Sequence, residues 1–139
     1  RGLEFDASVP KATSLTAADF FDIRVRVEDV GAFAVPPFWI RTKDEIEDDA
    51  LTRACTLTFM SDFGPVPVAR PDGTSLRDGF AASLDHAVWF HRPFVPRDWH
   101  RYEVTRLNNT DSRGLVTGAL YDTGGVLIAS TSQEALWRL

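Results

Sequence analysis

One short segment of the chain carries the side-chain types of a nucleophilic triad. Ser83, Asp85 and His86 supply a hydroxyl, a carboxylate and an imidazole within four positions. A serine becomes a nucleophile when an imidazole lies within hydrogen-bonding reach of its hydroxyl. The segment alternates as a strand does, and on a strand His86 points away from Ser83. We therefore expect no triad within this segment.

The other reactive side-chain types predict neither a metal site nor a reactive thiol. His86 and His91 are an odd number of residues apart, so they are expected on opposite faces of a strand, and no zinc-ligand spacing occurs. The only cysteine, Cys55, lies in a helical apolar stripe, where a cysteine is usually a small buried residue. The carboxylates from Asp44 to Asp49 indicate a solvated helix start rather than a calcium loop.

Three polar side chains interrupt apolar surroundings. Asp62 ends a predicted helix between Met60 and Phe63, so its carboxylate should be partly desolvated, with a raised pKa, and suited to act as a general base. The alternative is a helix-end carboxylate satisfied by backbone amides. Ser83 opens a bulky strand and Gln133 interrupts the last one. Each of these two alone is more typical of a sheet surface or a hydrogen-bonded core.

The predicted elements place these polar residues at the end of one helix and on the strands after it. Strands are expected at 21–30, 38–42, 83–91, 99–107, 114–121 and 126–137, a helix with an acidic beginning at 44–62, and a polar loop at 108–113. The helix carries a stripe at three-to-four spacing, Leu51, Ala54, Cys55, Thr58, Phe59 and Asp62, which is apolar with the Asp62 carboxylate at its far end. Gly64 and two prolines are expected to end it.

One apolar helix followed by antiparallel strands with short connections predicts an α+β fold. A sheet that curls around a single central helix buries the most apolar surface, and this is the hotdog arrangement. Residues 1–20 show no sustained periodicity and are expected to form an extended N-terminal arm. The hotdog domain then spans 21–139.

Composition excludes several classes of function. The 139 residues suit one domain, and the 44% that are hydrophobic suffice for a core. A net charge of −5 without a basic cluster argues against a nucleic-acid partner. Apolar runs fall short of the roughly 20 residues that a membrane span needs. One cysteine and the absence of a signal-peptide pattern at Arg1 lead us to expect a cytoplasmic location.

Three separated motifs resemble the acyl-CoA thioesterase II family. They are Phe59-Met60-Ser61-Asp62-Phe63 at the helix end; the segment Ser83 to Phe94, with Trp99, Tyr102 and Glu103 after it; and Gly125 to Glu134, with Gly114 to Gly118 and Tyr121 before it. The resemblance covers the chain from about Phe21 to Arg138. The motifs also occur in the order that the family shows.

The resemblance implies a thioesterase domain that hydrolyses fatty acyl-CoA to free fatty acid and CoA without a metal or organic cofactor. It implies that Asp62 takes a proton from a bound water while Ser83 and Gln133 hold that water. The acyl chain would lie in an apolar slot beside the helix. Candidates for binding the CoA phosphates, or for solubility alone, are Arg92, Arg106 and Arg113.

Family members usually carry two hotdogs in tandem, and this chain resembles only the second. A second hotdog, supplied by another copy of the chain or by an N-terminal half, is therefore an expected partner that covers the sheet edge and completes the pocket. Ser83 stands where threonine is common, which keeps the hydroxyl. A non-catalytic acyl-CoA-binding module and a purely structural half remain alternatives to an enzyme.

Overall fold

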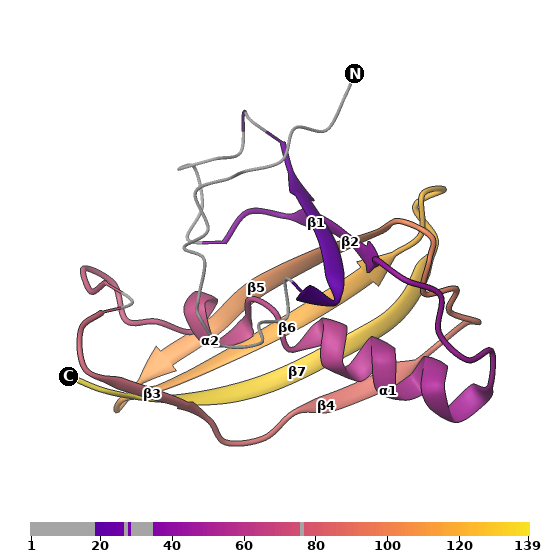
Figure 1. The fold of residues 1–139 in the computed structure, drawn as a ribbon. Helices are drawn as coiled ribbons and strands as arrows, with labels where there is room; N and C mark the ends of the chain where they lie inside the picture. Colours follow the sequence, from indigo (N-terminus) through magenta and orange to yellow (C-terminus); the bar gives the residue numbers. More distant parts are fainter. Residues whose placement is uncertain (1–18, 27, 29–34, 76) are drawn as a thin grey trace.

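The computed structural model describes residues 19–26, 28, 35–75 and 77–139, which form one curled antiparallel sheet with a helix against it (Figure 1). The strands are β1 (Phe21–Val25), β2 (Phe38–Thr42), β3 (Phe80–Ser83), β4 (Ala87–Phe90), β5 (His100–Thr110), β6 (Arg113–Tyr121) and β7 (Leu127–Arg138), and the helices are α1 (Ala50–Ser61) and α2 (Pro65–Val68). Along the sheet the order is β1-β2-β5-β6-β7-β3, and β4 also pairs with β7. The predicted α+β hotdog is confirmed.

Two of the sequence predictions fall partly on residues that the structure does not describe. Residues 1–18 of the predicted arm lie outside the described residues, as do residues 27 and 29–30 of the strand expected at 21–30. That strand is seen as β1. In the described part of the chain, no helix is long and apolar enough to cross a membrane.

Helix α1 packs on the sheet through its Leu57–Met60 side. Both side chains are almost completely buried and join a core that includes Ile40, Tyr102 and Leu120 from the sheet. Full burial of a Leu or Met side chain stabilises a fold by about 1.5–3 kcal/mol. These contacts therefore fix the end of α1, where Asp62 follows, against the middle of the sheet.

The apolar stripe expected to face the sheet instead faces away from it. Leu51, Cys55 and Phe59 are exposed, so the predicted burial of Cys55 is wrong. The helix has apolar residues on two sides, and periodicity alone does not say which side meets the sheet. Burial of Leu57, Met60 and Ser61 sets the rotation of the helix, and the carbonyl of Ser61 also receives a hydrogen bond from the sheet.

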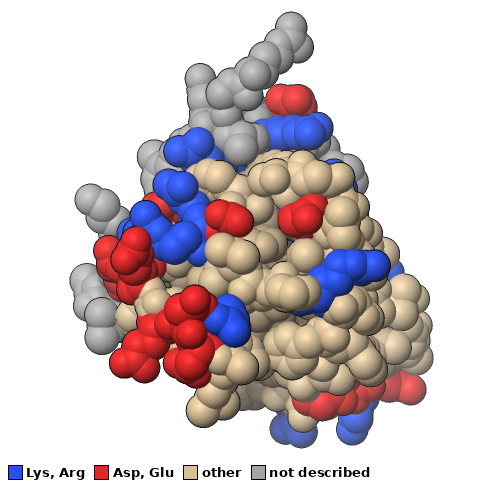
Figure 2. All heavy atoms as spheres, turned by 90° about the vertical axis from the view of Figure 1, so that its right-hand side faces the viewer, with Lys and Arg blue, Asp and Glu red and all other residues tan. Residues whose placement is uncertain are grey.

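Helix α1 begins later than its acidic segment suggests. Asp49 is the N-cap, and its Oδ1 accepts a hydrogen bond from the Thr52 amide at 2.9 Å. The carboxylates from Asp44 to Asp48 precede the helix, and Figure 2 shows acidic side chains gathered on the end of the molecule where α1 starts. The predicted end is confirmed, because Asp62 is the C-cap. The single turn of α2 was not predicted.

Strands β5 and β6 are joined by a tighter turn than expected. Asp111 and Ser112 both have a positive φ, of 52° and 64°. Two such residues in a row match the twist of a two-residue hairpin turn. The residues expected as a polar loop at 108–113 therefore belong mostly to the two strands.

Candidate active site

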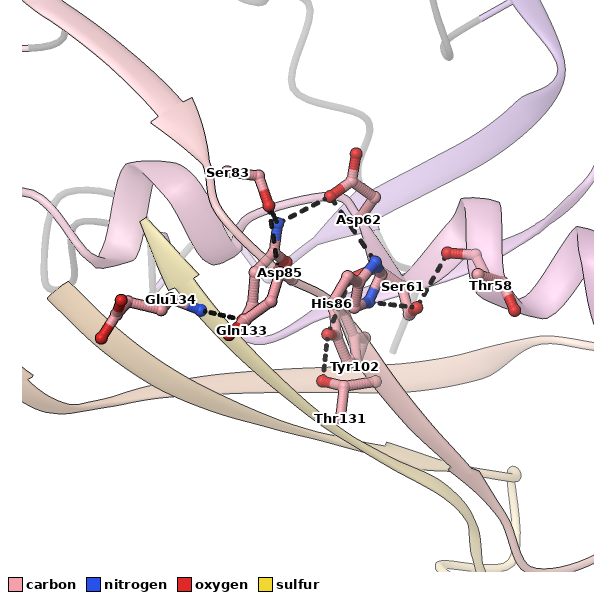
Figure 3. Close-up of polar contacts among 10 residues, drawn as sticks. All are labelled: Thr58, Ser61, Asp62, Ser83, Asp85, His86, Tyr102, Thr131, Gln133 and Glu134. Carbon is pink, nitrogen blue, oxygen red and sulfur yellow. Dashed lines mark hydrogen bonds and ion pairs between the residues drawn. The ribbon is translucent and has the colours of Figure 1, made fainter. Parts of the chain in front are cut away.

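The structure brings the three predicted site residues into one hydrogen-bonded cluster (Figure 3). The amide nitrogen of Gln133 donates to Asp62 Oδ1 at 3.0 Å and to Ser83 Oγ at 2.7 Å. Asp62 comes from the end of α1, Ser83 from the end of β3 and Gln133 from the middle of β7. Residues from three elements thus meet at one point.

The orientation of the Gln133 amide follows from its partners. A carboxylate only accepts hydrogen bonds, so the NH₂ group and not the carbonyl must face Asp62. Both N–H bonds of Gln133 are then used, one on Asp62 and one on Ser83. Its Oε1 is buried and has no hydrogen-bond partner among the described residues. Gln133 is therefore a hydrogen-bond donor to both Asp62 and Ser83, and it is held in place by burial, since the residue is only 1% exposed.

The two reacting candidates are more open to solvent than Gln133. The Asp62 side chain is 55% exposed, and Ser83 is exposed as well. The partial desolvation expected for Asp62 is thus absent from the chain on its own. Figure 3 shows one carboxylate oxygen directed to Gln133 and the other, Oδ2, directed away from the cluster.

A bulge between β3 and β4 explains why side chains from this segment converge. The strand expected at 83–91 is interrupted, because four steps from Ser83 to Ala87 are matched by only three steps along β7, from Ala135 to Ser132. One extra residue changes which face the following side chains occupy. The carboxylate of Asp85 accepts a hydrogen bond from the Glu134 amide at 2.8 Å and so holds the bulge on β7.

His86 is a site residue that the sequence interpretation placed wrongly. The bulge turns its ring towards the end of α1, where Nε2 is 3.1 Å from Ser61 Oγ and Nδ1 is 3.9 Å from Asp62 Oδ1. Ser83 is bonded to Gln133 and to the carbonyl of Asp85 instead. The expectation that Ser83 and His86 form no triad stands, but the reason given for it, strand alternation, was wrong. Nothing in the sequence of this segment distinguishes a bulged strand from a regular one.

A buried tyrosine ties the end of α1 to the sheet. Tyr102 Oη donates to the carbonyl of Ser61 at 2.8 Å and shares a hydrogen bond with Thr131 Oγ1 at 2.9 Å. Burial raises the pKa of Tyr102 to about 12, so the hydroxyl keeps its proton and remains a donor. Because Asp62 follows Ser61 directly, this hydrogen bond also helps to fix the distance between the Asp62 carboxylate and the sheet.

The candidate phosphate-binding arginines are all engaged within the chain. Arg92 donates to the carbonyl of Leu127, Arg106 pairs with Asp72, and Arg113 pairs with Glu134; the three pairs are all exposed. Exposed ion pairs such as those of Arg106 and Arg113 are typically worth about 1 kcal/mol or less, so a phosphate could compete with the carboxylates for these arginines. These arginines therefore stay candidates.

An apolar cavity of about 370 Å³ lies beside α1 on its exposed side. Its lining includes Phe20, Phe21, Ile46, Cys55 and Phe59. The Phe59 and Phe21 rings are in contact, with centroids 5.5 Å apart. The exposed stripe of the helix thus forms one wall of an apolar hollow.

Comparison with known proteins agrees with the motifs. A family model described as acyl-CoA thioesterase matches residues 20–136. Acyl-CoA thioesterase 2 of Haemophilus influenzae is 35% identical over 103 residues, which are 72% of this chain and 36% of that protein. Acyl-coenzyme A thioesterase 8 of Mus musculus is 38% identical over 104 residues, which are 73% of this chain and 32% of that protein.

A solved structure extends the likeness to almost the whole chain. The crystal structure of an acyl-CoA thioesterase II from Mycobacterium marinum has a TM-score of 0.75 at 29% identity and covers 99% of this chain and 58% of that one. The chain spans about a third of the length of the curated relatives. The family match across residues 20–136 shows that the chain belongs to the acyl-CoA thioesterase family.

Proposed function

We propose that this chain hydrolyses fatty acyl-CoA to free fatty acid and CoA by activating a water molecule. The observation that carries the proposal is the pair of hydrogen bonds from Gln133 to Asp62 and Ser83. It places a carboxylate and a hydroxyl next to each other, oriented by one buried amide. Membership of the family supports a thioester as the substrate.

Asp62 is the general base in this mechanism. Because Gln133 occupies Oδ1, Oδ2 is the oxygen that accepts the proton of the water. As that proton moves, the water oxygen bonds to the thioester carbonyl carbon and the carbonyl electron pair moves onto its oxygen. Collapse of this intermediate breaks the C–S bond, and the proton on Asp62 passes to the CoA sulfur. The carboxylate is thereby regenerated.

Ser83 orients the same water. Its hydroxyl donates to the carbonyl of Asp85 and accepts from Gln133, which leaves one lone pair. The water donates one hydrogen bond to Asp62 Oδ2, along which its proton is transferred, and a second hydrogen bond to this lone pair of Ser83. Its own lone pair is then directed at the substrate. Such positioning makes the attack of water on the thioester effectively unimolecular, which lowers the entropic part of the barrier.

The exposed side of α1 is the proposed place for the acyl chain. The apolar cavity there includes Phe59, three residues before Asp62. An acyl chain in this cavity would run towards the carboxylate at the helix end. Burial of methylene groups contributes about 0.8 kcal/mol each, so the cavity would favour medium or long chains over acetyl groups.

A second hotdog domain is the proposed partner that completes the site. Asp62 and Ser83 are open to solvent in the single chain, and the chain covers 58% of the solved relative's structure. A second domain over the site would exclude water other than the reacting one and strengthen the hydrogen bonds. It would come from another copy of this chain or from the rest of a longer protein.

The test is CoA release from acyl-CoAs of increasing chain length by the wild-type chain and by Asp62→Asn. The amide keeps the size of the side chain but cannot accept the proton, so we expect a loss of about 10²–10⁴-fold in kcat. Equal folding of the two proteins is checked by thermal unfolding. Binding of acyl-CoA without turnover by the wild type would support the non-catalytic binding module instead.

A further inference from the structure

His86 occupies the space between the end of α1 and the start of β4, behind the catalytic carboxylate. Its side chain is 18% exposed, and both ring nitrogens face polar atoms of α1. Nothing in the water-activation scheme above uses this ring. Its placement nevertheless depends on the bulge, which turns it to the same side as Ser83 and Gln133 (Figure 3).

The proton positions on the ring follow from Ser61. The Ser61 hydroxyl donates its only proton to the carbonyl of Thr58 at 2.9 Å. Its oxygen must therefore accept from His86, so Nε2 carries a hydrogen. The other nitrogen, Nδ1, has no partner in Ser61 and faces the carboxylate instead, 3.9 Å from Asp62 Oδ1.

Asp62 Oδ1 is thus approached from two directions. Gln133 donates to it from β7, and Nδ1 of His86 faces it from the segment before β4 at ion-pair distance, with the attraction present when the ring carries its second proton. The other polar groups nearby have other partners. The Asp85 carboxylate accepts from the Glu134 amide, and the Glu134 side chain pairs with Arg113. The Tyr102 hydroxyl is bonded to Ser61 and Thr131. Among the described residues, Asp62 is the only acidic side chain paired with His86.

We propose that His86 is a positioning residue for Asp62, in which Nδ1–H of the doubly protonated ring and the Gln133 amide together hold Oδ1 so that Oδ2 is presented to the water. This inference rests on the proposed function. Only the Nδ1 end of the ring acts on the carboxylate, and the Nε2 end anchors the ring on α1. A loose carboxylate would still accept a proton but would spend less time aligned with the water.

Two substitutions separate the two ring nitrogens. His86→Asn places an amide at the position of Nδ1, where its N–H can donate to Asp62. His86→Gln places the amide at the position of Nε2, where it reaches Ser61 and leaves the carboxylate without its second partner. We expect His86→Gln to lower kcat by about 10-fold to 100-fold, because a misplacement of reacting groups by about 1 Å can cost up to about 100-fold in rate, with KM unchanged. His86→Asn should retain most of the activity.

The matched control is His91→Asn. His91 is exposed and bonded to Ser130 Oγ at 2.8 Å, so this change should leave kcat and KM unchanged. Equal losses in the Asn and Gln variants of His86, or a larger loss in the Asn variant, would overturn the inference and leave a structural role. So would kcat values of the wild-type level in both.

Crystal structures of the two variants provide a measurement that does not depend on turnover. The Asp62–Gln133 hydrogen bond should persist in His86→Asn and lengthen or break in His86→Gln. An inactive wild type with this structural difference would contradict the proposed hydrolysis while supporting the role of His86. An unmoved Asp62 in both variants would overturn the role of His86 whatever the activity.

Discussion

The Tyr102 hydroxyl lies against Gly118, in the space that a side chain at that position would occupy. A Cβ built on Gly118 would lie 2.3 Å from Tyr102 Oη and 2.3 Å from Thr131 Oγ1. Glycine at this position is therefore what allows the tyrosine to reach the carbonyl of Ser61. The position of the Asp62 carboxylate therefore depends on the absence of a side chain at Gly118, on the opposite side of the core.

Gly118→Ala is expected to weaken both the fold and the site. The added methyl group must displace the tyrosine or the strand, and such overpacking costs about 1–3 kcal/mol. Urea unfolding measures this loss, and kcat should fall because Asp62 moves with the end of α1. Gly124→Ala is the control, since its Cβ would meet only Asp122 Oδ1 at 3.3 Å. A stability equal to that of the wild type would contradict the packing argument.

Gln133→Met is expected to separate stability from activity. Methionine has a similar shape but cannot donate to Asp62 or Ser83, so kcat should fall by about 10²-fold, as when a preorganised donor is removed. Stability should stay within about 1 kcal/mol of the wild type, because the buried Oε1 of Gln133 has no partner among the described residues and its removal relieves a desolvated group. Denaturant unfolding and steady-state kinetics on the same samples check both parts. A strongly destabilised variant with parallel loss of activity would argue against this separation.

His100 is expected to make the fold sensitive to mild acid. Its burial lowers its pKa below the ordinary value of 6.5, against the opposing effect of its hydrogen bond to the Asp98 carbonyl. The unfolded chain therefore binds more protons than the folded chain below about pH 6.5, and the free energy of unfolding falls as the pH drops through the folded pKa. Each unit by which the pKa differs between the two states is worth about 1.4 kcal/mol.

The matched variant for this prediction is His100→Asn. Its amide can still donate to the carbonyl of Asp98 but does not titrate in this range. Urea unfolding at about pH 7.5 and about pH 5 should show a smaller loss of stability in the variant than in the wild type. Identical losses would assign the acid sensitivity to other groups.

The sequence singled out the three residues that meet in the structure, but it did not predict how they are arranged. Asp62, Ser83 and Gln133 stand out as polar residues in apolar surroundings, and the family motifs name the same three. Their meeting around one amide depends on three elements far apart in the chain. The hotdog order of elements was predictable because the hydrophobic period changes from helical to alternating after the prolines.

The errors have particular physical causes. The rotation of α1 follows from burial of its Leu57–Met60 side in the core, and Tyr102 adds a hydrogen bond to Ser61 from 41 positions away. The position of His86 is decided by one extra residue opposite β7, which no local pattern reveals. The start of α1 is decided by the single carboxylate that reaches the Thr52 amide, although several neighbours have the same chemistry. Tertiary contacts therefore decided the first two of these, and a local cap decided the third.

The bulge between β3 and β4 sets a limit on how this segment can vary in length. A chain that lacked one residue between Ser83 and Ala87 would pair with β7 in perfect register and gain a more regular ladder. Ser83 and His86 would then be two positions apart and would stay on the same face. A segment of the present length that paired with β7 without the bulge would put them on opposite faces, because they are three positions apart. The length of this segment and its bulge therefore have to change together if both side chains are to remain at the site.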